Sequence, residues 1–162
     1  MNLHESIFSW YDVPEDIKNL LLLAAENWEN TLEAQEYINQ ALDKAGNNTD
    51  VLVSAYRFFF YKRNYQAALK ITDKVLDKIE KSEHLPEDWK QLKPILISRQ
   101  DEPQIRLYLS TYAASGFIFA RLGEVAKAKE LTQKIKEINN TSEFAAATVS
   151  DVLTRPLEEE DY

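Results

Sequence analysis

The stretch Leu109–Asn140, LSTYAASGFIFARLGEVAKAKELTQKIKEINN, decides the fold. It predicts two antiparallel helices joined at Leu122-Gly123, because small and large residues recur at helical spacing on both sides of that turn. Small residues at Gly116 and Ala128 would let the two backbones approach closely. We expect the helices to meet through Tyr112, Ser115, Gly116, Phe119, Val125, Ala128, Thr132 and Ile135. Because one such pair cannot bury its apolar faces alone, further pairs are expected.

The composition sets bounds on what the protein can be. Its 162 residues are 44% apolar and 28% charged, which is typical of one soluble domain with a sizeable core. The chain has no cysteine, which excludes disulfides, thiol catalysis and cysteine zinc sites. A net charge of −8 counts against nucleic-acid binding. The first residues do not form a secretory signal, and the near-apolar run Leu20–Ala25 is too short to span a bilayer, so we expect a cytoplasmic protein.

Working outward from Leu109–Asn140, we predict helix pairs over about 14–45, 50–81 and 103–139. Ala34 and Ala68 lie one 34-residue period apart, and Ala128 follows after one more period plus a 26-residue insertion. Within the second pair, three consecutive phenylalanines at 58–60 point to different sides of a helix, so that helix should be packed on several sides. Its partner helix should have a solvated outer face with weak ion pairs such as Asp77–Lys81.

Local signals place the helix ends of the first pair. Asp12 is a candidate N-cap, with Pro14 in the first turn of a helix that runs to about Trp28. The next helix should turn Leu32 inward together with these residues: Ala34, Tyr37, Ile38, Ala41 and Leu42. Gly46 then follows as a glycine just past the helix end.

The insertion, residues 82–102, interrupts the repeat pattern. Pro86-Glu87-Asp88 resembles the first turn of a helix, and Pro94 should end or kink that helix at Lys93. Five of its residues are too apolar for a solvated loop: Trp89, Leu92, Ile95, Leu96 and Ile97. We expect them to form an extra helix against the second and third pairs. The alternative is that they close over one end of a binding groove and help to select the partner.

The two terminal segments have distinct compositions. The aromatic residues within 1–12 indicate a segment that covers the first helix pair or, alternatively, an arm that binds a partner. A last, capping helix is expected over about 142–153. The acidic tail 156–162 is expected to be disordered.

The spacing and residue types resemble the tetratricopeptide repeat family. Its 34-residue pattern matches best in the third pair and partly in the second, where Tyr56 stands in place of a small residue; the third-pair positions are Tyr112, Ser115, Gly116, Phe119, Gly123, Val125 and Ala128. The resemblance implies an all-α protein: a right-handed stack of helix pairs, or α-solenoid, with an inserted helix and a C-terminal capping helix. One domain would then cover residues 1–155.

The overall layout has a narrower resemblance. It rests on AYRFFFYKRNYQAALK at 55–70, LPEDW at 85–89, PQIRLYL at 103–109, RLG at 121–123 and VLTRP at 152–156. Together these segments are similar to small tetratricopeptide proteins of bacterial nitrogen-fixation gene clusters. That resemblance implies an accessory protein that assists nitrogenase assembly or electron supply.

The family resemblance also implies a binding surface, because inner helices of such stacks line a concave groove. On this chain, the groove positions select Arg57, Phe60, Tyr61, Phe117 and Arg121. Arginine and aromatic residues are enriched in binding hot spots. We therefore expect an adaptor or assembly factor that binds a partner protein or peptide through these side chains. Two alternatives stay open: the phenylalanines are core residues, or the groove is buried in a homodimer.

Catalysis is not expected. The two histidines, His4 and His84, lie outside the predicted helix pairs, and no phosphate loop, nucleophile elbow or zinc-protease motif is present. Glutamates at 26, 29, 33 and 36 lack the histidine partners of a metal site in a helix bundle. The sequence therefore predicts neither a metal nor a cofactor.

Overall fold

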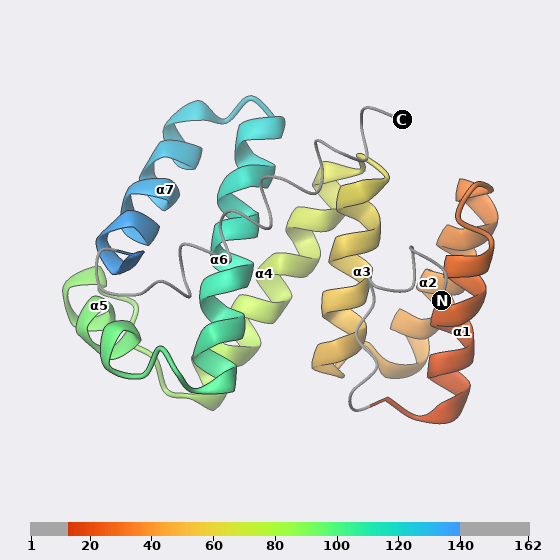
Figure 1. The fold of residues 1–162 in the computed structure, drawn as a ribbon, viewed down its shortest axis with the longest axis horizontal. Helices are drawn as coiled ribbons and strands as arrows, with labels where there is room; N and C mark the ends of the chain where they lie inside the picture. The colour runs from red at the N-terminus through yellow and green to blue at the C-terminus, as the bar shows by residue number, and fades with distance from the viewer. Residues whose placement is uncertain (1–12, 140–162) are drawn as a thin grey trace. The chain divides into compact units, whose positions relative to one another are not determined.

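In the computed structural model, which describes residues 13–139, the protein is all-helical (Figure 1). Seven helices follow one another along this part of the chain: α1 Glu15–Glu26, α2 Thr31–Ala45, α3 Thr49–Tyr61, α4 Tyr65–Ser82, α5 Trp89–Ser98, α6 Pro103–Arg121 and α7 Val125–Asn139. The all-α prediction is confirmed. The predicted N-terminal segment, capping helix and acidic tail lie outside the described residues, and a single domain over 1–155 stays a prediction.

The chain divides at Ile71–Thr72 into two compact units. The first unit packs α1 against α2 and α2 against α3. Phe58 is at the centre, fully buried, with its ring 5.6 Å from that of Trp28 and 5.4 Å from that of Phe59, both edge to face. Helix α3 is buried on several sides, as predicted, because residues 51–56 and 58–60 all lie in the interior.

The second unit is built around the antiparallel pair α6 and α7 (Figure 1). Their close approach at Gly116 is confirmed: a Cβ atom there would lie 3.3 Å from the Cβ of Leu131. The predicted face of α7 was wrong in two positions, since Val125 is 56% exposed and Thr132 is exposed. The buried line is Ala128, Leu131, Ile135 and Ile138. Leu131 takes the place expected for Thr132 because the larger apolar side chain buries more surface.

Three predictions about the first unit require correction. Leu32 is 82% exposed, because it shares its side of α2 with the exposed Glu36 and Asn39 rather than with the buried Ala34. Helix α1 begins at Glu15 with Pro14 in the N-cap position, whereas Asp12 lies outside the described residues. The helix also ends before Trp28. Asn27 lies at the C-cap, and its side-chain amide donates a hydrogen bond of 2.8 Å to the Leu23 carbonyl.

Gly46 does follow α2, but it is not left-handed. Its φ of −66° and ψ of −7° are helical, so conformational freedom is not the reason for a glycine here. A Cβ atom at this position would lie 2.5 Å from the Leu42 carbonyl oxygen. The glycine is therefore required by this close approach.

Helix α5 also differs from its prediction. It begins at Trp89, with Asp88 in the N-cap position, so Pro86 lies before the helix and not in its first turn. Pro94 lies inside α5, which continues to Ser98. Leu92 and Leu96, on either side of the proline, are both buried. Their burial, at roughly 1.5–3 kcal/mol each, offsets the roughly 3 kcal/mol cost of an interior proline.

The turns at the ends of α3 and α6 repeat the same geometry 60 residues apart. Arg63 and Gly123 both have positive φ, 64° and 83°. In each turn the next amide donates to the carbonyl five residues earlier, Asn64 to Phe59 at 2.8 Å and Glu124 to Phe119 at 2.9 Å. This pattern of hydrogen bonds is the Schellman motif. His84 forms a third copy at the end of α4, with φ of 54°.

Substitutions at these left-handed positions should have opposite effects on stability. Gly123→Ala is expected to lower the free energy of unfolding by about 1 kcal/mol, since no atom crowds the new Cβ and the cost is in the backbone alone. His84→Gly is expected to raise the free energy of unfolding by about 0.5–1 kcal/mol. His84 is exposed, and glycine adopts its positive φ without the strain that a histidine side chain causes. Urea unfolding of both variants tests the pair, and two changes of the same sign would contradict it.

Candidate functional site

The α3 members of the predicted groove are Arg57, Phe60 and Tyr61. Arg57 and Tyr61 are partly buried, and they lie one helical turn apart on α3. Phe60 is only 7% exposed. Its ring contacts that of Tyr61 at 5.9 Å and that of Tyr65, on α4, at 5.7 Å. Phe60 thus supports Tyr61 from beneath, and Arg57 and Tyr61 offer the accessible surface.

The α6 members are Phe117 and Arg121, which are both partly buried. The guanidinium carbon of Arg121 lies 5.1 Å from the centre of the Phe117 ring. Such a cation–π contact, with i,i+4 spacing, contributes roughly 0.5–1 kcal/mol at an exposed site. It also orients the guanidinium, so less side-chain entropy is lost when a ligand binds.

The five predicted residues are therefore found as two sets. The structure brings Phe60 and Tyr61 together in the first unit and Phe117 and Arg121 together in the second. Arg57 lies on α3 with the first set. Whether the two sets bind one ligand stays a prediction.

Lys62 plays a role that sequence reasoning missed. Its Nζ donates a hydrogen bond to the Trp28 carbonyl and lies 4.4 Å from the centre of the Trp28 ring. The lysine thereby ties the end of α3 to the turn between α1 and α2. The available signal was the spacing, because Lys62 and Trp28 are 34 residues apart, which is one repeat period.

The insertion contains an extra helix, as predicted, and α5 packs against α7 of the third pair. Trp89 donates a hydrogen bond of 2.9 Å from its indole nitrogen to Glu137, and Lys134 lies 5.2 Å from the centre of the Trp89 ring. Glu137 also forms an ion pair of 3.7 Å with Lys93. These contacts fix α5 to α7. The sequence indicated that Trp89 packs against other residues, but it did not indicate its partners, Glu137 and Lys134.

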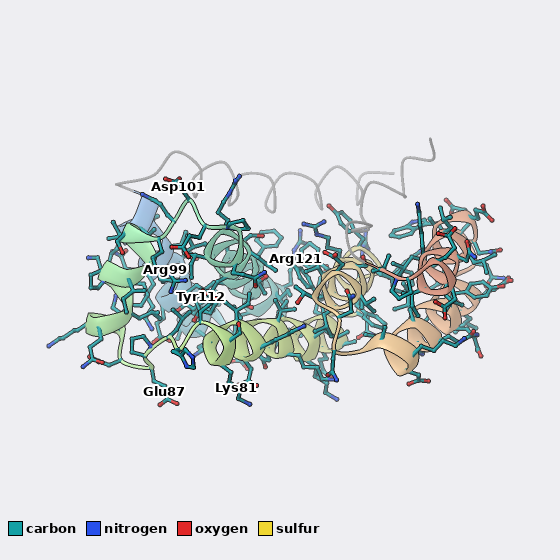
Figure 2. The ribbon with its side chains drawn as sticks, turned by 90° about the horizontal axis from the view of Figure 1, so that it is seen from below. Lys81, Glu87, Arg99, Asp101, Tyr112 and Arg121 are labelled. Carbon is teal, nitrogen blue, oxygen red and sulfur yellow. The ribbon has the colours of Figure 1, made fainter. Side chains whose placement is uncertain are left out.

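Polar contacts fix the rest of the second unit. Arg99 binds Glu102 through Nε at 2.9 Å and Nη2 at 2.7 Å, and it also binds Glu83. The hydrogen bonds to Glu102 and Glu83 raise the pKa of Arg99. By contrast, Lys81 and Glu87 project away from the helices (Figure 2). The predicted Asp77–Lys81 ion pair is present at 2.9 Å, but its exposure limits it to well under 1 kcal/mol.

Two tyrosines on α6, the buried Tyr108 and the partly buried Tyr112, have a raised pKa. The Tyr108 hydroxyl donates a hydrogen bond of 2.9 Å to Glu80 on α4, and its ring stacks on that of Tyr112 at 6.0 Å. Burial, followed by the charge of Glu80 and this hydrogen bond, raises the pKa of Tyr108. Burial, followed by the charges of Glu130 and Glu80, raises the pKa of Tyr112. Both groups stay neutral at physiological pH, so they serve packing and hydrogen bonding.

The part of the chain from 13 to 139 contains no cluster of three or more acidic or histidine side chains that could hold a metal ion. Over the same residues, no helix is long and apolar enough to cross a membrane.

These observations define a protein that is all-helical over residues 13–139. The chain belongs to the family of a protein from Azotobacter chroococcum mcd 1 named "Uncharacterized 19.8 kDa protein in nifW 5'region". It is 31% identical to that protein over 134 residues, which are 80% of this chain and 74% of the relative. No protein-family profile matches the chain, and no solved structure matches it.

Proposed function

We propose that the protein is a non-catalytic adaptor or assembly factor, cytoplasmic and accessory to nitrogen fixation, which binds a partner protein through the first helices of its pairs. The repeated turn geometry at Arg63 and Gly123 supports a tetratricopeptide-like unit. Burial of Ala34, Ala68 and Ala128 at equivalent positions of the second helices supports it too. The observation that carries binding is the stacked pair of Phe117 and Arg121 at the surface of α6.

The link to nitrogen fixation is drawn from the relative. Its printed name places it in the nifW 5′ region, and this chain resembles it over most of its length. In this proposal, the helix pairs form a right-handed stack in which Arg57 and Tyr61 contact the partner together with Phe117 and Arg121. Truncating such residues costs about 1–3 kcal/mol of binding each, so a double change should weaken binding by about 30-fold or more.

Affinity capture from the native cell tests the proposal. The wild type and Arg57→Glu/Arg121→Glu would be compared in cells grown with and without fixed nitrogen. Lys70→Glu/Lys74→Glu is the matched control, because it makes the same charge change on the exposed face of α4. We expect a partner that the wild type and control retain and the arginine variant loses, while circular dichroism shows all three to be folded.

Two other results would contradict parts of the proposal. Identical partners for all three proteins would exclude the arginine surface. A dimer by light scattering that Arg57→Glu/Arg121→Glu dissociates would favour self-association instead. A partner unrelated to nitrogen fixation would retain the adaptor role and remove the assigned process.

A further inference from the structure

Helix α7 has a groove on its outer side that neither packing nor the proposed function uses. The groove has a volume of about 520 Å³, and six of its seven lining residues come from α7, joined by Ala120 of α6. Lys129 and Lys136 lie two turns apart along it, and the 56% exposed Val125 lies at the end nearest the start of the helix. No acidic side chain lines it.

The charges of α7 divide into two groups. Lys127 and Lys134 both pair with Glu130, at 3.4 Å and 3.6 Å. Within residues 13–139, no ion pair joins Lys129 or Lys136 to an acidic side chain. A protein of net charge −8 therefore presents a groove with two lysines and no acid.

The equivalent face of α2 is covered by another helix, α3. Ile38 of α2 lies 94 positions before Thr132, the spacing that also separates Ala34 from Ala128. Ile38 is fully buried, and α3 packs on α2, whereas Thr132 is exposed. Lys136 stands where α2 has Leu42. The face of α7 that corresponds to a packing face of α2 is therefore exposed and carries lysine in place of leucine.

We propose that this groove binds the segment Leu157–Tyr162 of the same chain, LEEEDY. Its four consecutive carboxylates complement Lys129 and Lys136, and an apolar residue at each end can cover Val125. The dimensions agree: six residues of extended chain span about 17 Å between first and last Cα, and Val125 to Lys136 is about 17 Å of helix. The opposite charge favours this acidic segment, and the apolar contact at Val125 fixes how the segment is aligned along the groove.

The connection permits this contact within one molecule. Residues 140–156 lie between α7 and the segment. With the expected helix over 142–153, about 18 Å long, and up to roughly 17 Å from the other five residues, this connection is longer than the roughly 22 Å of α7. Because the segment is joined to α7 in one chain, its effective concentration at the groove exceeds that of a free peptide, so weak ion pairs suffice. Because the pairs are exposed, the contact should weaken as salt shortens the Debye length from about 10 Å at 0.1 M to about 3 Å at 1 M.

A spin label gives the sharpest test. The full chain lacks cysteine, so Thr154→Cys provides a single labelling site near the acidic run without altering it. We expect paramagnetic broadening of the amide signals of α7 around Lys129 and Lys136, several-fold weaker in 1 M salt. Adding Lys129→Glu/Lys136→Glu should abolish the broadening, whereas adding Lys70→Glu/Lys74→Glu on α4 should leave it.

Three outcomes would overturn the proposal. Broadening that persists in the Lys129→Glu/Lys136→Glu protein would show that the lysines do not hold the segment. Broadening that is absent from α7 in the labelled full chain would leave the groove to another occupant. Broadening that appears only between labelled and unlabelled molecules mixed together would assign the groove to a second copy.

Discussion

Replacing Phe58 by alanine is expected to lower the free energy of unfolding by about 3–5 kcal/mol. The side chain is fully buried and contacts the rings of Trp28 and Phe59 edge to face. Alanine would remove those contacts and leave a cavity that the surrounding helices fill only in part. Since small domains are stable by only about 5–15 kcal/mol, this one change should remove a large share of the total.

Leu32→Ala provides the matched control. It also shortens a large apolar side chain, but Leu32 is 82% exposed, so its free energy of unfolding should change by less than about 0.5 kcal/mol. Urea unfolding followed by circular dichroism would measure both variants. A similar loss in the two would contradict the placement of Phe58 at the centre of the first unit.

The contrast between Phe58 and Leu32 shows how far the sequence determines the fold. Where apolar residues surround a helix, as at 51–60, burial follows whichever way the helix turns, and the prediction for α3 was confirmed. Where a helix is amphipathic, one apolar residue at its edge has two possible environments. The pattern could not decide for Leu32 or Val125, because their exposure depends on the exact rotation of the helix against its neighbour.

Local rules also fail where tertiary packing outweighs them. One of the two expectations for Pro94, that the helix ends at Lys93, is wrong, since α5 continues to Ser98 with Leu92 and Leu96 buried on either side of the proline. Gly46 was expected just past the end of α2, where it does lie, but its backbone is helical and its small size is needed beside the Leu42 carbonyl. Both differences come from contacts that a sequence pattern does not record.

The candidate site was predictable in its residue types but not in its partners. Repeat spacing placed Phe117 and Arg121 on one face of α6, where the structure brings them into contact. For Phe60, the alternative of a core phenylalanine describes the structure better, because its side chain lies almost wholly in the interior and its ring contacts that of Tyr61. The lysines of the α7 groove were missed, because charged residues on an outer helix face usually indicate only solvent.

Raising the pH above 10 is expected to destabilise the protein through Tyr108 and Tyr112. Burial raises the pKa of both hydroxyls in the folded state, whereas in the unfolded chain they titrate near pH 10. Below pH 10 both are neutral in both states, and their contribution is fully present. Above it the unfolded chain binds fewer protons, so the free energy of unfolding should fall by up to about 1.4 kcal/mol per pH unit for each tyrosine.

Tyr108→Phe separates this effect from general alkaline unfolding. At pH 8 the variant should lose only about 1 kcal/mol, the usual contribution of the hydrogen bond to Glu80. Between pH 10 and 11, however, it should lose less stability than the wild type, because one buried hydroxyl no longer titrates. Lysine deprotonation affects both proteins equally and cancels in the difference. Urea unfolding at pH 8, 10 and 11 measures the two slopes, and equal slopes would mean that the Tyr108 hydroxyl is open to solvent rather than buried against Glu80.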